Sequence, residues 1–291
     1  YRLAHRSWSG WVCGDYGFLF RLRSKMNLIT IMLTAAAVIF GLMTLLWVVS
    51  LLLKNSSIVD IFWGAGFVIS AWLYFFLTPE GYLPRKIILL VLATVWGMRL
   101  TLHVFLRNHN KGEDFRYQKW RRESGRIWWI KSLFQVFLLQ GLLMWLISFP
   151  LMTAQFYNRS HQLGFLDYLA VLLWAVGFFF EFVGDLQLTR FRKNPANNGA
   201  VLSTGVWRYS RHPNYFGDSA QWWAYYLFSL SAGGWWSIFS PIIMTLFLIK
   251  VSGVALLEKT LKDEKPGYRE YMESTSAFIP WFPKKNGNKG N

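Results

Sequence analysis

The sequence is poor in the residues that build disulfide frameworks and metal centres. Its 291 residues include a single cysteine, Cys13, and five histidines that form no cluster. One cysteine can make neither an internal disulfide nor a thiolate metal site. The histidines are too few and too scattered for the histidine boxes of membrane di-iron desaturases and hydroxylases, so we expect no metal centre.

Charged residues are also scarce, at 16% of the chain, whereas soluble domains carry about 25%. Hydrophobic residues make up 54% of the chain and aromatic residues 19%. The 17 tryptophans suit a membrane protein, because indole rings favour the boundary between lipid headgroups and water. These proportions exclude an ordinary soluble domain.

Two further absences narrow the function. No glycine-rich fingerprint of the Rossmann type follows a strand, since Gly64-Ala-Gly66 lies inside an apolar run. Any dinucleotide would therefore bind in a non-Rossmann manner. The net charge of +16 comes from basic residues that flank apolar runs, and no nucleic-acid-reading module is recognisable, so we expect no nucleic-acid partner.

Seven apolar runs are long enough to cross a bilayer, whose core takes about 20 residues of helix. Backbone polar groups cannot stay unpaired in lipid, and the runs are too long for barrel strands, so we predict helices. The fold class is therefore all-α, a polytopic membrane protein with about seven transmembrane helices, the last two forming a hairpin. The runs cover about residues 28–53, 58–77, 87–106, 128–150, 164–183, 217–233 and 235–257.

The distribution of lysine and arginine predicts the orientation. The segments after the first, third, fifth and seventh runs hold 20 of these residues, and the segments after the second, fourth and sixth hold 3. Lysine and arginine concentrate in cytoplasmic loops, so we expect a cytoplasmic C-terminus. The protein is predicted to lie in a bacterial inner membrane, or in the endoplasmic reticulum if it is eukaryotic.

One folded domain is expected over residues 26–283, followed by a disordered tail at 284–291. Residues 1–25 carry five lysines and arginines on the predicted outer side, which conflicts with the orientation rule, and Met26 comes next. We interpret residues 1–25 as an extension that does not belong to the native chain, for instance from a misassigned start. The alternative is a short amphipathic segment at the membrane interface.

A few ionisable residues fall within the apolar runs, where they are costly and mark function by default. Asp60 lies near the start of the second run, and Arg99 and His103 lie four residues apart in the third, on one helical face. We take these three as candidate catalytic residues. The alternative is an interhelical polar clamp that fixes the packing.

The segment 181–218 is the richest in polar chemistry. It holds six basic side chains, counting His212, together with acids, amides and two tyrosines. Arginines bind phosphates bidentately, so the segment suits a large anion held at the membrane face. A solvated basic loop is the alternative. The tail from Glu258 onward is predicted to fold back over this segment, as a lid or as packing on the membrane surface.

The stretch Arg208–Asp218 contains Arg-His-Pro-Asn-Tyr-Phe-Gly-Asp and resembles the C-terminal signature of the steroid 5-alpha-reductase family. It is more closely similar to the bacterial branch of that superfamily that is described only as a domain of unknown function. Trp63-Gly64, Trp96-Gly97-Met98-Arg99 and the Lys-Pro-Gly-Tyr-Arg-Glu-Tyr tail fit the same branch. The resemblance covers roughly residues 30–283.

The resemblance implies an NADPH-dependent reductase, with an apolar substrate cavity among helices 1–4 and a cofactor site on helices 5–7. We expect a monomer in the membrane. By position, Asp185, Arg192, Asn214 and Asp218 match cofactor-contacting residues of the family. Glu181 stands where the steroid enzymes have Asn, Asp218 where they have Glu, and Trp96 about where they have a catalytic Tyr. We extend the predicted cofactor site to Lys193, Arg208, Tyr209, Arg211, His212, Tyr215, Glu258 and Tyr268.

The expected reaction is hydride transfer to the β-carbon of an enone, in a steroid or another apolar lipid. A protonated Asp60 would donate a hydrogen bond to the carbonyl, and Arg99 or His103 would stabilise the enolate. The main alternative is an S-adenosylmethionine-dependent methyltransferase of the isoprenylcysteine or phospholipid type, which shares an Arg-His-Pro-x-Tyr-x-Gly stretch. Its usual paired acids are missing, since Lys259 follows Glu258. A membrane scaffold or transporter is the third possibility, although no inverted repeat is visible.

Overall fold

The computed structural model describes residues 26–109, 111–251, 254, 258, 261 and 265–284. The predicted extension at 1–25, with Cys13, lies outside these residues, as does the predicted tail beyond Lys284. Every regular element of the described chain is helical, which confirms the all-α prediction.

Five helical stretches are long and apolar enough to cross a membrane. They are α2 (Leu28–Leu53), α3 (Ile58–Leu77), α4 (Leu83–Asn108), the composite stretch Phe115–Phe156 and α9 (Phe165–Lys193). The composite stretch contains α5 (Phe115–Ser124), η1 (Gly125–Ile127), α6 (Trp128–Ser132), the π-helical η2 (Leu133–Leu138), α7 (Leu139–Ile147) and α8 (Phe149–Phe156). The protein is therefore a multi-pass membrane protein by length and composition of its helices.

The last two predicted helices are shorter or more polar. They correspond to α10 (Pro213–Ala232) and to the apolar helix Trp235–Lys250, formed by η5 (Trp235–Ile238), α11 (Phe239–Leu246) and most of η6 (Phe247–Val251). Pro213 begins α10, where a proline costs no hydrogen bond, and Gly233 ends it with a φ of 111°. The short turn predicted between these two helices is present, while seven crossings stays a prediction.

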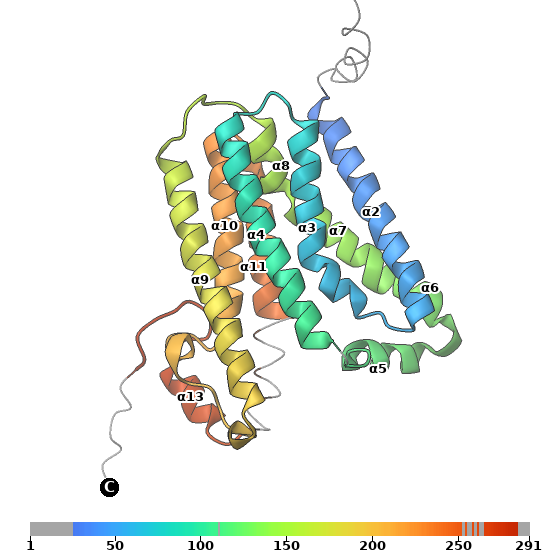
Figure 1. Ribbon diagram of the computed structural model, residues 1–291, viewed down its shortest axis with the longest axis vertical. Helices are drawn as coiled ribbons and strands as arrows, with labels where there is room; N and C mark the ends of the chain where they lie inside the picture. The colour runs from blue at the N-terminus through green and yellow to red at the C-terminus, as the bar shows by residue number, and fades with distance from the viewer. Residues whose placement is uncertain are drawn as a thin grey trace, which may run out of the picture.

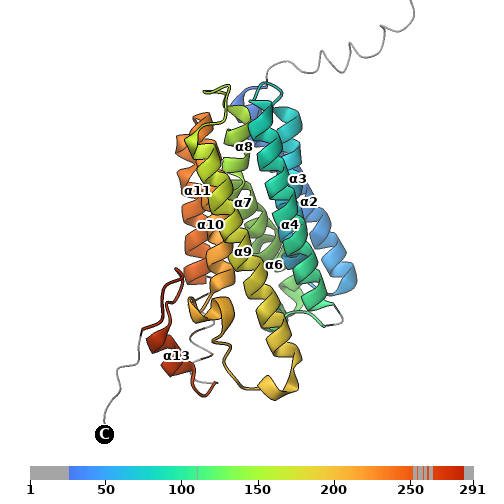
Figure 2. The ribbon, with the colours of Figure 1, turned by 60° about the vertical axis from the view of Figure 1, so that its left-hand side comes forward.

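The long helices run side by side along the long axis of the molecule (Figures 1 and 2). At one end, here called the α13 end, lie α5, the end of α9, η3 (Pro195–Asn197), η4 (Gly205–Arg208) and α13 (Tyr268–Ser274). Within the bundle, α10 packs most extensively against α9 and also contacts α8 and α4. Polar residues of α4, α9 and α10 are thereby brought to a common interior.

Glycines allow α9 and α10 to approach closely. A Cβ on Gly217 would lie 2.4 Å from the backbone oxygen of Gly177 and 2.4 Å from the backbone nitrogen of Glu181. Only glycine fits at such a contact, because any larger side chain would overlap the facing backbone. The close approach places the first turns of α10 directly against the acidic part of α9.

Aromatic side chains fill the middle of the bundle. Phe67, Trp96, Trp222 and Tyr225 are all fully buried. The ring centroids of Phe67 and Trp222 lie 4.6 Å apart, and those of Trp96 and Trp222 lie 5.4 Å apart in a T-shaped arrangement. Trp96 is thus part of the core, and the apolar substrate cavity predicted among the first four helices stays a prediction.

Candidate functional site

A buried ion-pair network joins α4 to α9 near the α13 end. The guanidinium of Arg99 donates to Glu181 Oε1 and to Asp185 Oδ2, each at 2.6 Å. The three side chains are between 4% and 12% exposed, so the charges are largely removed from water. His103, one turn further along α4, has Nε2 3.6 Å from Asp185 Oδ2, which is longer than a hydrogen bond.

Helix α10 completes the network with polar groups on one face. Asn214 donates from Nδ2 to Asp185 Oδ1 at 3.0 Å, and Gln221 donates from Nε2 to Glu181 Oε2 at 2.6 Å. Asp218 lies between them along the helix, is 9% exposed, and interacts electrostatically with both acids of α9 and with Arg99. Three helices therefore converge on one polar interior.

The network has more acceptors than donors. Its three carboxyl groups, on Glu181, Asp185 and Asp218, face one arginine and one histidine. Asn214 Oδ1, Asp218 Oδ1 and Gln221 Oε1 are buried and have no partner within hydrogen-bond geometry among the described residues. Two buried indole N–H donors also lack such a partner, although Trp96 interacts with Glu181 and Trp222 with Asp218. Leaving a buried acceptor unpaired costs about 1–3 kcal/mol, so the network is suited to a ligand that supplies hydrogen-bond donors.

Asp60, the third predicted catalytic residue, belongs to a separate cluster. Tyr117 donates from its hydroxyl to Asp60 Oδ1 at 2.8 Å, and Arg116 donates to Oδ2 at 3.2 Å. Gln140 donates to the Tyr117 hydroxyl at 3.3 Å. No hydrogen bond or ion pair joins Asp60 to Arg99 within the described chain. Asp60 therefore ties α5 onto the start of α3.

Arg211, His212 and Glu258 form a clasp between the start of α10 and the C-terminal segment. Arg211 Nε and His212 Nε2 donate to Glu258 Oε1 at 2.8 and 3.2 Å. Burial opposes ionisation of Glu258, but the hydrogen bonds from His212 and Arg211 outweigh it and lower the pKa. Arg211 Nη1 also donates to the carbonyls of Met272 and Thr275, at 2.7 and 2.8 Å.

Tyr268 lies beside this clasp. Burial, and after it the charge of Glu258, raise the pKa of Tyr268 to about 12. Its ring centroid lies 5.9 Å from that of Tyr271, whose hydroxyl donates to the backbone carbonyl of Trp207. The clasp residues predicted for the cofactor thus also hold the tail against the loop after α9.

Exposed cations gather where α4 and α9 end. Arg192 and Lys193 at the end of α9 are exposed, and Arg192 interacts electrostatically with Arg107 of α4. Arg208 is exposed as well but belongs to η4. Partial burial, and after it the charge of Arg192, lower the pKa of Lys265. Neither Arg107 nor Arg192 has a carboxylate partner in the part of the chain that the structure describes. Like charges held together in this way favour binding of an anion.

Tyr215 borders both groups. It stacks on His212 with ring centroids 5.6 Å apart and an interplanar angle of 4°. It also interacts electrostatically with Arg107, Asp185 and Arg192. Tyr215 therefore lies within electrostatic range both of Arg107 and Arg192 and of Asp185 in the buried network.

Five contributors were not assigned to the site by the sequence analysis: Arg107, Arg116, Tyr117, Gln221 and Lys265. Signals for two of them were present, because Arg107 continues the spacing of Arg99 and His103, and Gln221 follows Asp218 by three residues. Arg116 and Tyr117 carry no such signal, since their role depends on α5 folding back to α3. Tyr209, in contrast, lines an apolar hollow together with Phe180 of α9 and with Pro280, Trp281 and Phe282 of the C-terminal segment.

Together, these features define a multi-pass helical membrane protein with a buried polar network near one end of its bundle. The chain matches, over residues 46–275, a family described as a protein of unknown function, DUF1295, and it belongs to that family. It is also 28% identical over 270 residues to an uncharacterized protein of Schizosaccharomyces pombe, across 83% of this chain and 77% of the yeast protein. No solved structure matches the chain.

Proposed function

We propose that this protein is a membrane reductase that uses NADPH to reduce an activated C=C bond of an apolar lipid, such as a Δ4-3-oxo steroid or another enone. NADPH would supply the hydride when bound. The observation that carries the proposal is the buried network of α4, α9 and α10, with its unpaired acceptors and the unpaired cations beside it. The resemblance of Arg208–Asp218 to the steroid 5-alpha-reductase signature supports the same reading.

The unpaired acceptors fit one end of this cofactor. Asn214 Oδ1, Asp218 Oδ1 and Gln221 Oε1 need donors, and a nicotinamide carboxamide and ribose hydroxyls provide them. Arg99 would hold Glu181 and Asp185 in place through its two 2.6 Å contacts. In this proposal Arg99 positions the cofactor site and does not touch the substrate carbonyl.

The cations near the ends of α4 and α9 fit the phosphates, although the partly buried Lys265 also donates to the carbonyl of Ala200 at 2.8 Å. Arg107, Arg192 and Lys265 lie in an electrostatic chain in which each cation influences the next. Phosphate oxygens would relieve this repulsion through charge-assisted hydrogen bonds. NADPH carries three phosphates, whereas S-adenosylmethionine carries none, so a cluster of this kind favours the dinucleotide.

The acidic surplus also favours a reductase over a methyltransferase. Glu181, Asp185 and Asp218 would stabilise positive charge next to them. Such charge grows during hydride loss from a dihydronicotinamide and declines during methyl loss from a sulfonium. Only an interaction that is stronger in the transition state than in the ground state accelerates a reaction.

On the substrate side, a proton has to come from a group other than Trp96, whose indole is buried in the core. Asp60 is the candidate that we propose. Both of its oxygens accept hydrogen bonds, from Tyr117 and Arg116, so Asp60 would first bind a proton in place of one of these donors and then pass that proton to the enolate carbon. A general acid also has to lie within hydrogen-bond reach of the atom that it protonates. The C=C substrate then lies between the Asp60 cluster and the network.

We propose seven crossings with the α13 end in the cytoplasm. Two cations, Arg85 and Lys86, follow α3 on the side opposite the α13 end. Both are buried inside the protein, so they do not conflict with the rule that exposed lysines and arginines concentrate in cytoplasmic loops. Arg85 is fully buried and pairs with Asp167 at 2.7 Å. Lys86 is 3% exposed and donates to the carbonyl of Phe75 at 3.0 Å.

Ligand-dependent stability tests the proposal. The purified chain in detergent would be unfolded by heat in the presence of NADPH, NADH or S-adenosylmethionine. A ligand at a hundred times its Kd stabilises the folded state by about 2.7 kcal/mol. We expect a shift with NADPH that is lost in Arg192→Ala and Asp218→Asn and kept in Arg126→Ala, an exposed arginine in η1.

Each other result has a clear meaning. A shift with S-adenosylmethionine alone would replace the reductase by the methyltransferase. No shift with any of the three would favour the scaffold or transporter. A confirmed NADPH shift leads to an assay of NADPH oxidation with 3-oxo steroids and other enones.

A further inference from the structure

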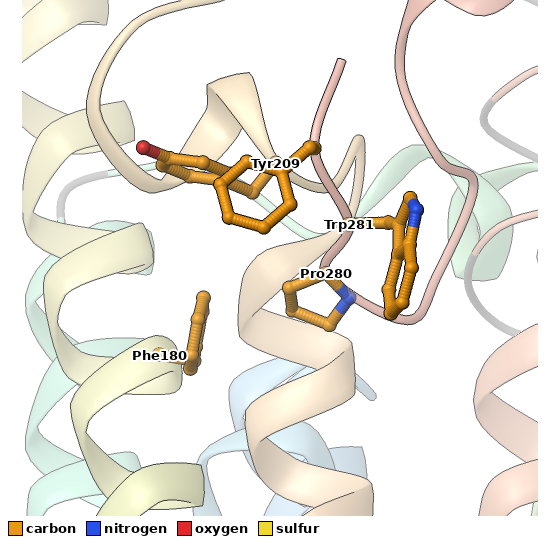
Figure 3. Close-up of a pocket in the computed structure, with 5 residues that line it drawn as sticks. Phe180, Tyr209, Pro280 and Trp281 are labelled. Carbon is orange, nitrogen blue, oxygen red and sulfur yellow. The ribbon is translucent and has the colours of Figure 1, made fainter. Parts of the chain in front are cut away.

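An apolar hollow lies on the outside of the bundle at the α13 end (Figure 3). It has a volume of about 310 Å³ and is lined by Phe180 of α9, Tyr209, and Pro280, Trp281 and Phe282 of the C-terminal segment. Tyr209 and Phe282 close one side with ring centroids 6.1 Å apart. The size falls at the lower end of the range of small-ligand sites, about 300–1,000 Å³.

The C-terminal wall of the hollow is held in place by its backbone. Trp281 donates its N–H to the carbonyl of Tyr209 at 2.9 Å, and Ser210 donates to the carbonyl of Phe278 at 2.8 Å. Lys284 donates its N–H to the carbonyl of Ser274 at 2.9 Å. The segment is therefore fixed on the protein although its side chains face outward.

Those outward side chains are large and apolar. Ile279 is 64% exposed, Trp281 71% and Phe282 77%, and the neighbouring Phe179 of α9 is 54% exposed. Phe179 and Phe180 belong to a helix that is long and apolar enough to cross a membrane. Aromatic side chains of this kind gather at the headgroup boundary, so the hollow faces lipid.

Two cations flank the hollow in the chain. Arg208 precedes Tyr209, and Lys284 follows Phe282 by two residues. Both are exposed, and neither has a carboxylate partner among the described residues. We propose that the hollow binds one anionic phospholipid, with an acyl chain against the aromatic walls and the phosphate toward Arg208 and Lys284.

This site does not depend on the proposed reductase activity. It gives Arg208 and Tyr209, which the sequence analysis assigned to the cofactor, a different ligand. Since Tyr209 and Ser210 lead directly into the Arg211 clasp, a bound lipid would also hold the tail on the loop after α9.

Native mass spectrometry of the full chain in detergent tests the lipid site. The protein would be titrated with phosphatidylglycerol or phosphatidylcholine of equal acyl chains. Each lysine or arginine near an anionic lipid surface contributes about 1 kcal/mol to the binding free energy, which corresponds to about a fivefold change in affinity. We expect at least a fivefold preference for phosphatidylglycerol, reduced about fivefold by Arg208→Gln and by Lys284→Gln, and unchanged in Arg126→Gln.

A second variant tests the walls separately. Phe282→Ala removes apolar surface and no charge, so it should weaken both lipids by the same factor. These residues are exposed, so folding of the variants is not at stake. Equal affinity for the two lipids in the unaltered protein, or a preference that survives loss of both cations, would overturn the proposal. Unchanged binding in Phe282→Ala would overturn it as well.

Discussion

Replacing Arg99 by methionine should destabilise the protein more than loss of any exposed arginine. Arg99 is the one cation in hydrogen-bond contact with Glu181 and Asp185 among the described residues, and all three side chains are at most 12% exposed. Methionine fills much of the volume but leaves both carboxylates without their partner. Breaking a buried pair in this way costs about 3–5 kcal/mol.

A double-mutant cycle separates the ion pair from packing. Free energies of unfolding would be measured for Arg99→Met, Glu181→Gln and the combination. Glutamine at 181 keeps an acceptor for Gln221, which now donates to Oε2 at 2.6 Å, so this single change should cost less. The combined variant should lose less than the sum of the two, with a coupling of about 0.5–3 kcal/mol.

Arg107→Met is the matched control, because Arg107 lies eight residues further along α4 and is exposed. Exposed substitutions usually change stability by at most about 0.5 kcal/mol. If Arg99→Met behaved like Arg107→Met, or if the two changes at 99 and 181 were simply additive, the buried ion-pair network would not exist as described.

Three other predictions follow from particular contacts. The folded-state pKa of Glu258 lies below its ordinary value of 4.5. The clasp therefore contributes its full stability above pH 4.5, and this contribution is lost as the pH falls through the folded-state pKa. The difference in melting temperature between the unaltered protein and Glu258→Gln should shrink as the pH falls below about 4.5. A Cβ at 217 would lie 2.4 Å from facing backbone atoms, so Gly217→Ala should cost about 1–3 kcal/mol or more in a denaturation assay, whereas Gly41→Ala, with no atom within 4 Å of the added carbon, should be neutral or stabilising. In a cysteine-free background, Arg126→Cys should react with an impermeant thiol reagent only from the cytoplasmic side and Arg159→Cys only from the other, and the reverse labelling would refute the proposed orientation.

The apolar runs of the sequence correctly predicted the parts of the helices that lipid would cover. They did not predict where the helices begin and end outside those parts. The run predicted at 164–183 is the apolar part of α9, which continues to Lys193. The run predicted at 87–106 is α4, which begins at Leu83 with Pro84 in its first turn. Hydropathy reports the residues that the bilayer covers, whereas a helix ends where its backbone hydrogen bonds end, so the two need not coincide.

The site shows the same division. Spacing along a single helix correctly placed Arg99 and His103 on one face of α4, because residues four apart share a face. Spacing could not assign partners from other helices. Arg99 meets Glu181, 82 residues away, and Asp60 meets Tyr117 in place of Arg99.

The sequence alone determined the apolar helices, the polar faces of those helices and the excess of lysine and arginine in the loops at the α13 end. Each of these features depends on whether a short stretch of chain is more stable in lipid or in water. What only the tertiary structure decided is which charges neutralise each other. Gly177 and Gly217 let α9 and α10 approach closely, so the acids of both helices share one interior with Arg99. Ion pairs depend on distances of a few ångströms between segments far apart in the chain, and helix packing alone sets those distances.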